Sequence, residues 1–98
     1  MIKQKFIQQT AERLMNNAAI EIPDDYHEGL KNAAEQEDGD LSSFVLNAML
    51  ENYEAAKIDK RAMCGDTGCP RWYVKVGNEA EIEGGMVGLE TSLRRATA

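Results

Sequence analysis

The stretch CGDTGCPRWYVKVG, residues 64–77, decides the predicted fold class, because the pattern of the chain changes there. Its first five residues predict a turn broken by glycines. In the residues that follow, Trp72, Val74 and Val76 alternate with Tyr73 and Lys75, and this alternation is typical of a β-strand. The sequence before the stretch has helical periodicity instead. The sequence therefore predicts an α+β fold that is mainly α.

Residues 1–61 predict three helices in front of this stretch. Pro23 separates the first helix from the second, because the residue before a proline avoids the helical region and proline suits a first helical turn. We expect Gly39 to close the second helix and Asp40 to cap the third. The third helix is apolar on nearly every side, so we expect it at the centre of an N-terminal three-helix bundle. The apolar residues that define the three helices are Phe6, Ile7, Ala11, Leu14, Met15, Ala18, Ala19, Tyr26, Leu30, Ala33, Ala34, Leu41, Phe44, Val45, Leu46, Ala48, Met49, Leu50 and Tyr53.

Residues 62–98 predict a strand and then a C-terminal helix that begins near Gly84 and Gly85. A single strand is not stable alone, so either residues 79–82 pair with it or a sheet is completed elsewhere. The last helix reaches Ala98 without a stop signal, from which we expect a truncated chain. With 98 residues, both parts are expected to form one compact unit.

The charge of the chain limits its function. The chain carries 17 acidic and 11 basic side chains, a net charge of −6, and the whole excess lies in residues 1–60. An acidic surface repels a phosphate backbone, so the sequence predicts no binding to nucleic acid. No apolar run approaches the roughly 20 residues of a membrane span, and no signal-peptide core follows the N-terminus, so we expect a cytoplasmic protein without a membrane partner.

Two residues of the glycine-broken turn could take part in chemistry. A Cys64 thiolate is a soft metal ligand, and Asp66 could handle a proton or a polar ligand. The alternative is that Cys64 is a small buried hydrophobe. Cys69 follows at a spacing that is unusual for zinc, and His27 is interpreted as a surface residue. Two thiols in a reducing compartment stay reduced, and they are too few for a complete iron–sulfur site.

Arg94 and Arg95 are candidates for binding an anion. A guanidinium binds a carboxylate through two parallel hydrogen bonds, which suits a dicarboxylate. The alternative is that both bases only complement the dipole at the end of a helix. Successive residues of a helix point about 100° apart, so we expect one ligand to meet only one of the two.

Four motifs occur in order along residues 62–98: Cys64-Gly-Asp-Thr-Gly68, then residues 70–77, then Ile82-Glu-Gly-Gly85, and then residues 93–97, LRRAT. In these motifs the sequence resembles the iron–sulfur hydro-lyases, namely the class I fumarases and the L-tartrate dehydratases. Residues 1–61 agree in length and character only. The resemblance implies that the chain is the N-terminal part of an alpha subunit, with an assembly region over 1–61 and the start of the catalytic region over 62–98.

The resemblance also implies a cofactor, partners and site residues. In that family a 4Fe-4S cluster is held by three cysteines and adds or removes water across a carbon–carbon bond. By resemblance Cys64 is the first cluster ligand, Asp66 faces the substrate, and Arg94 binds a substrate carboxylate. The other two cysteines lie beyond this chain, and Cys69 is not expected to be a ligand. We therefore expect the chain alone to be inactive and without an intact cluster, and to need the rest of the alpha part and the beta subunit.

Three interpretations remain open. The leading one is reversible hydration of fumarate to malate, a reaction of the tricarboxylic acid cycle, with L-tartrate as the alternative substrate. The second is a non-catalytic domain for subunit interaction or homodimerisation, which the apolar third helix and the lone strand suggest. A small redox or zinc protein is the third.

Overall fold

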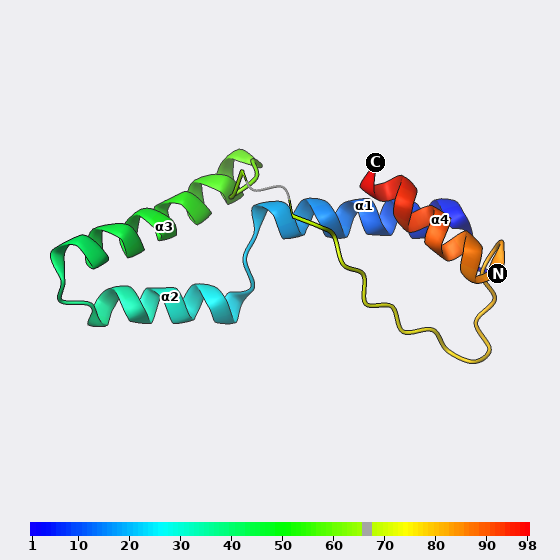
Figure 1. Ribbon diagram of the computed structural model, residues 1–98, viewed down its shortest axis with the longest axis horizontal. Coiled ribbons are helices and arrows are strands. Elements are labelled where there is room, and N and C mark those ends of the chain that lie inside the picture. The colour runs from blue at the N-terminus through cyan, green and yellow to red at the C-terminus, as the bar shows by residue number, and fades with distance from the viewer. Residues whose placement is uncertain (66–67) are drawn as a thin grey trace. The chain divides into compact units, whose positions relative to one another are not determined.

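The computed structural model describes residues 1–65 and 68–98 of the chain. Its helices are α1 (Gln4–Ile20), α2 (Asp24–Gln36), α3 (Asp40–Asp59) and α4 (Gly85–Thr97) (Figure 1). The chain divides into two units: the hairpin unit, Asn17–Gly65, and the terminal unit, which combines Met1–Asn16 with Asp66–Ala98. No described helix has the length and apolar sequence that crossing a bilayer requires.

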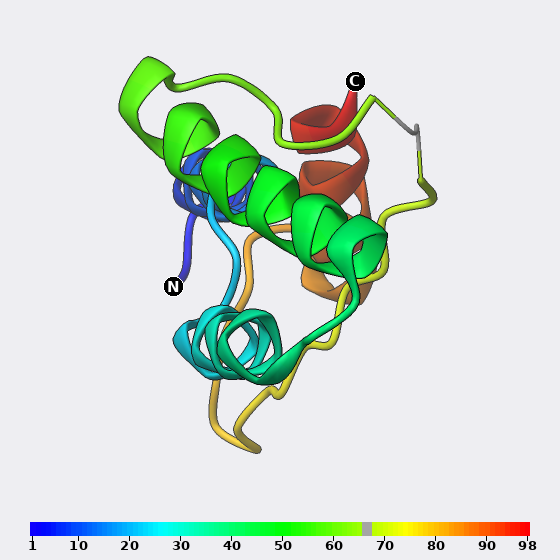
Figure 2. The same cartoon turned by 90° about the vertical axis from the view of Figure 1, so that its left-hand side faces the viewer.

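In the hairpin unit α2 and α3 lie side by side and run in opposite directions (Figures 1 and 2). Helix α2 follows Pro23, whose φ of −58° suits a helix start, and two acidic residues occupy its first turn. It ends at Glu37, which is extended. Gly39 therefore does not close α2 as predicted; it is the residue before α3, and Asp40 is the first helical residue rather than a side-chain cap.

Helix α3 is not the central helix that the sequence predicts. Ala56 is buried, with 5% of its surface exposed, whereas Leu41 and Phe44 are 77% and 72% exposed. The helix ends at Lys60, which takes the left-handed conformation and donates its N–H to the carbonyl of Ala56. Helix α3 thus packs along one side only among the described residues.

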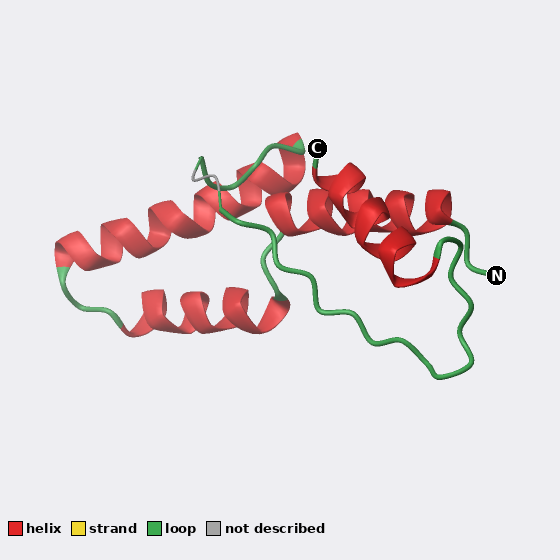
Figure 3. Ribbon diagram, turned by 45° about the vertical axis from the view of Figure 1, so that its right-hand side comes forward, coloured by secondary structure: helices red, strands yellow, loops and turns green. Residues whose placement is uncertain are grey.

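The terminal unit places α4 obliquely against the first half of α1 (Figures 1 and 3). Small residues recur every fourth position along α4, at Gly84, Gly88, Ser92 and Ala96. Such spacing puts them on one face of a helix, where they permit close approach of a neighbouring backbone. Ser92 is fully buried and donates its hydroxyl to the Gly88 carbonyl at 2.8 Å, and the most buried apolar side chains of this unit are Ala11 and Leu89.

Residues from the start of the chain are joined to the residues just before α4. Ile2 forms an isolated parallel bridge with Ile82, in which the Ile2 N–H donates to the Glu81 carbonyl at 2.6 Å and the Glu83 N–H donates to the Ile2 carbonyl at 2.9 Å. The Gln4 side chain donates to the Glu83 carbonyl at 3.1 Å. We call this set of bonds the terminal clasp.

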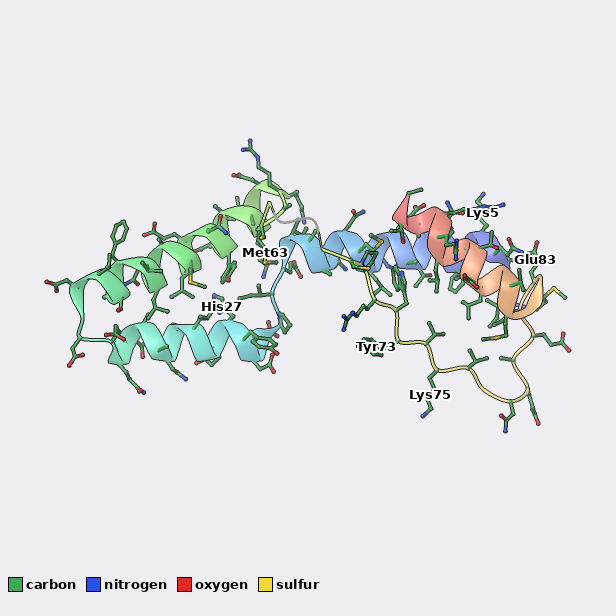
Figure 4. All side chains as sticks on the ribbon, in the orientation of Figure 1. Lys5, His27, Met63, Tyr73, Lys75 and Glu83 are labelled. Atoms are coloured by element: carbon green, nitrogen blue, oxygen red, sulfur yellow. The ribbon has the colours of Figure 1, made fainter. Side chains whose placement is uncertain are left out.

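The terminal clasp explains why the predicted strand is absent. Ile82 pairs with Ile2, so no described residue forms a ladder with residues 72–76, and that segment is extended without being a strand. Tyr73 and Lys75 stand out from the segment (Figure 4), and Tyr73 is 91% exposed. The α+β prediction, with its strand and its three-helix bundle, was therefore wrong, although the chain is mainly α as expected.

Candidate functional site

Cys64 follows a residue whose backbone is held on both sides. The Met63 N–H donates to the Ala19 carbonyl at 2.9 Å, and the Met63 carbonyl accepts a hydrogen bond from the Asn52 side chain at 2.8 Å. Ala19 lies near the end of α1 and Asn52 lies on α3, and the chain reverses between Asn52 and Met63 at Lys60. Figure 4 labels Met63 at this point. The end of α1 and the Asn52 side chain of α3 therefore fix where the glycine-broken turn begins.

The surroundings of Cys64 suit a ligand for a larger group. Cys64 is an exposed thiol and not the buried hydrophobe of the alternative interpretation. A side chain built at Gly65 or Gly68 would meet nothing within 4 Å, so the space beside the turn is open. A 4Fe-4S cluster held by protein alone needs three or four thiolates, and the sequence contains two cysteines. Cys64 thus fits one ligand position, and further ligands must come from other segments.

The described residues leave part of the prediction at this turn untested. Among the described residues, no three His, Cys, Asp or Glu side chains gather closely enough to hold a metal ion. Asp66 lies outside the described residues, so its predicted role in substrate binding stays a prediction.

Arg94 lies in the last turns of α4 and is paired with Glu90. Its Nε and Nη2 atoms donate to the same Glu90 oxygen at 3.1 and 2.7 Å. The two side chains are 79% and 62% exposed, and exposed pairs of this kind contribute only about 0–1 kcal/mol. A carboxylate ligand could therefore replace Glu90 at the guanidinium. Arg95, the neighbouring candidate, is also exposed.

A groove of about 560 Å³ runs beside Arg94 within the terminal unit. Cys69, Pro70 and Trp72 line one side of it, and α4 lines the other with Leu93, Arg94, Thr97 and Glu90. The structure thus brings Cys69 to the groove of Arg94, while Cys64 belongs to the hairpin unit. Lys75 lines a separate hollow of about 280 Å³ together with Ile2 and Leu89.

His27 lines a hollow of about 300 Å³ at the end of the α2–α3 pair away from Gly39, where acidic and basic side chains meet. The lining residues include Glu21, Asp24, Glu54 and Lys57. His27 itself is exposed, as predicted. This hollow offers no metal site within the described residues.

The sequence interpretation missed two residues that position the site. The spacing of four between Glu90 and Arg94 on a predicted helix is a recognisable signal for an ion pair. Asn52 has no such signal, because its bond to Met63 spans eleven residues and depends on the chain reversal at Lys60.

Comparison with known proteins decides the family. A family model described as Fumarate hydratase (Fumerase) matches residues 8–98. The chain belongs to the fumarate hydratase (Fumerase) family. The chain is also 31% identical over 87 residues to a protein of Methanocaldococcus jannaschii described as "Putative L(+)-tartrate dehydratase subunit alpha". No solved structure matches the chain.

The match covers different shares of the two proteins. It covers 86% of this chain but only 30% of the M. jannaschii protein, so the chain spans about a third of that relative's length. The family comparison confirms the resemblance to the first part of a hydro-lyase alpha subunit. The relative is named as one subunit, which is consistent with a subunit partner for this chain.

Proposed function

We propose that this chain is the first part of an alpha subunit of a lyase that interconverts fumarate and malate by reversible hydration. The observation that carries the proposal is Cys64, an exposed thiol that begins the C-G-D-T-G turn directly after Met63, whose backbone is held by two hydrogen bonds. The family match includes this turn. A cytoplasmic location and a place in the tricarboxylic acid cycle belong to the same proposal.

In this proposal Cys64 is one of three thiolates that hold a 4Fe-4S cluster. A bound cluster with one open iron supplies a Lewis acid for the hydroxyl and carboxylate of the substrate. The chain's own part is to present the Cys64 sulfur next to the held backbone of Met63 and to leave open space at Gly65 and Gly68. The chain alone has too few cysteines for the cluster, so it is inactive without the rest of the alpha part and a beta subunit.

Asp66 and Arg94 are the proposed substrate contacts. An arginine can hold a carboxylate by two parallel N–H bonds, and the same Nε and Nη2 atoms now donate to Glu90. Substrate binding at Arg94 would therefore displace Glu90. Because the pair is exposed, this exchange costs little.

L-tartrate is the second candidate substrate. The M. jannaschii relative, whose name refers to a tartrate dehydratase, favours it. Malate and L-tartrate are both dicarboxylates with a hydroxyl group that is lost on dehydration, so the site residues named above would serve either reaction.

The experiment is a chimera in which residues 8–98 replace the matching segment of the M. jannaschii alpha protein, produced with its partner subunit. After anaerobic reconstitution, iron content, fumarate hydration and tartrate dehydration are measured on the same samples. We expect iron and one of the two activities in the chimera and neither in the 98-residue chain alone. Activity on tartrate but not fumarate would overturn the fumarate assignment.

Two pairs of matched variants test the residue roles in the chimera. Cys64→Ser should abolish activity and lower iron content, while Cys69→Ser should change neither. Arg94→Ala should raise KM for the dicarboxylate about 10- to 100-fold, as expected for loss of a charge-assisted bidentate bond, while Arg95→Ala should change it far less. A Cys64→Ser chimera that kept both iron and activity would contradict the proposed ligand role.

A further inference from the structure

Helix α3 has a second apolar face, which is exposed at Leu41 and Phe44 and meets the Met63 carbonyl at Asn52. Apolar residues spaced mainly three, four and seven positions apart form one stripe along this face of the helix: Leu41, Phe44, Val45, Ala48 and Ala55. We call this stripe the outer face. Leu41 and Phe44 are 77% and 72% exposed and Val45 is 46% exposed, although burial is the usual state of such side chains.

The outer face is distinct from the face that packs within the hairpin unit. The less exposed residues of α3 follow a different stripe, on the other side of the helix: Ser43, Leu46, Met49, Leu50, Tyr53 and Ala56. Helix α3 contacts α2, and apolar residues on both of its sides leave it with little amphipathic character. A helix apolar on two sides is expected to pack on two sides.

Charge distinguishes between the partners that could cover the outer face. The hairpin unit carries eleven acidic and four basic side chains, a net charge of −7. On α3 itself Asp40, Glu51 and Asp59 flank the outer face. A second copy would bring the same acids opposite one another, and like charges across an interface are unfavourable. A partner with basic flanks has the complementary charge.

The length of the outer face defines the shape of the partner. From Leu41 to Ala55 the stripe spans fifteen residues, and its ends are about 21 Å apart at a rise of 1.5 Å per residue. That length matches four turns of a helix, and anchors at spacings of three and four are the usual contact pattern between two helices.

We propose that the outer face binds a basic amphipathic helix of the partner subunit. The inference rests on the proposed function only for the existence of a partner subunit; the surface and its charge come from the hairpin unit alone. The partner helix places small and branched apolar side chains against Phe44 and Val45, and its Lys or Arg side chains meet Glu51 and Asp59.

Direct binding to the 98-residue chain tests the proposal without any cluster or activity. Three fluorescent 18-residue peptides are compared at two salt concentrations: one with an apolar Leu and Ala stripe and Lys flanks, one with the same stripe and Glu flanks, and one with the Lys peptide's residues scrambled. We expect the Lys peptide to bind at least about tenfold more tightly than the other two, with affinity falling as salt rises.

Two variants link this binding to the outer face. Phe44→Ser with Val45→Ser should weaken the Lys peptide at least about tenfold while circular dichroism stays unchanged, because these side chains are exposed in the free chain. Glu51→Gln with Asp59→Asn should weaken binding of the Lys peptide about as much and reduce the salt dependence of that binding. These surface changes leave the apolar packing untouched. Matched changes at Glu28 and Glu35 on α2 serve as the control.

Each outcome decides the proposal. Equal affinity for the Lys and scrambled peptides, or for the chain and its outer-face variants, would show unspecific attraction to an acidic protein and overturn it. No binding would overturn it as well. A dimer in sedimentation velocity that dissociates on Phe44→Ser would assign the outer face to a second copy instead. None of these results affects the chimera test of Cys64, so failure here and failure of the proposed function are separable.

Discussion

Gly88 is the residue at which the packing of α4 leaves the least room. A Cβ at this position would collide with the Glu83 carbonyl and lie 2.9 Å from the Gln4 amide nitrogen. We expect Gly88→Ala to lower the free energy of unfolding by about 1–3 kcal/mol, which urea denaturation measures. Gly29→Ala is the matched control in an open part of α2, where alanine should stabilise the chain by about 1 kcal/mol. Equal effects of the two changes would contradict the close packing at Gly88.

Asn52 is the residue that connects helix α3 to the backbone before Cys64. Asn52→Ala removes the side-chain bond to the Met63 carbonyl. We expect the amide hydrogen of Met63 to exchange with solvent about tenfold faster. Of the two hydrogen bonds that hold the Met63 backbone, only its own N–H bond to the Ala19 carbonyl then remains. Hydrogen exchange followed by NMR measures this rate.

Asn47→Ala is the control for Asn52, since the Asn47 amide donates to the Ser43 carbonyl of its own helix. It should leave exchange at Met63 unchanged. In the chimera, the Asn52 variant should also lose iron faster than the Asn47 variant. If Met63 exchanges equally in both variants, Asn52 has no positioning role.

The end of α3 depends on an unusual conformation at Lys60. This residue has φ of 58° and ψ of 40°, which costs a residue with a side chain about 1 kcal/mol and costs glycine little. We expect Lys60→Gly to raise the free energy of unfolding by about 0.5–1 kcal/mol. Lys57→Gly, three residues earlier within the helix, should lower it by about 1 kcal/mol. Thermal or urea unfolding of both variants checks the opposite signs.

The sequence predicted where the helices of this chain lie better than it predicted which segments pair with one another. Periodicity and Pro23 located α1, α2 and α3 closely, and Gly84 located the start of α4. The strand over 72–76 was wrong because alternation indicates a half-buried extended segment but not whether a partner is available. The partner that was expected, residues 79–82, contains Ile82, which pairs with Ile2 instead.

The candidate site was predictable only in part. The C-G-D-T-G motif pointed to Cys64, whose thiol is exposed, while its role as a ligand stays a prediction. The central position expected for α3 was wrong, because apolar residues all round a helix do not show which side has a partner within the same chain. The groove of Cys69, Trp72 and Arg94 was not foreseen, because it joins segments more than twenty residues apart.

At the scale of the whole molecule, charge is unevenly shared. The hairpin unit has a net charge of −7 and few buried side chains, so repulsion between its acids opposes folding. Raising the salt concentration from about 0.01 M to about 0.15 M shortens the Debye length from about 30 Å to about 8 Å. We therefore expect the midpoint of thermal unfolding, followed by circular dichroism, to rise by a few degrees.

The control for this salt effect lies on α2. Glu28→Gln with Glu35→Gln makes the net charge of the hairpin unit less negative by two, without touching a buried residue. The variant should be more stable at low salt and should respond less to added salt. A midpoint of thermal unfolding that does not change with salt would show that repulsion between the acidic side chains does not lower the stability of the hairpin unit.

The terminal clasp also sets an order of events during synthesis. Ile2 bonds to residues 81 and 83, so it has no partner until some 80 further residues have been made. At about 5–20 residues per second, that delay is about 4–16 s. The α2–α3 pair is complete by residue 59 and can form during the delay. Ile2 is thus synthesised well before it is placed, and Ile7, which is partly buried in the finished unit, stays accessible to chaperones until the clasp closes.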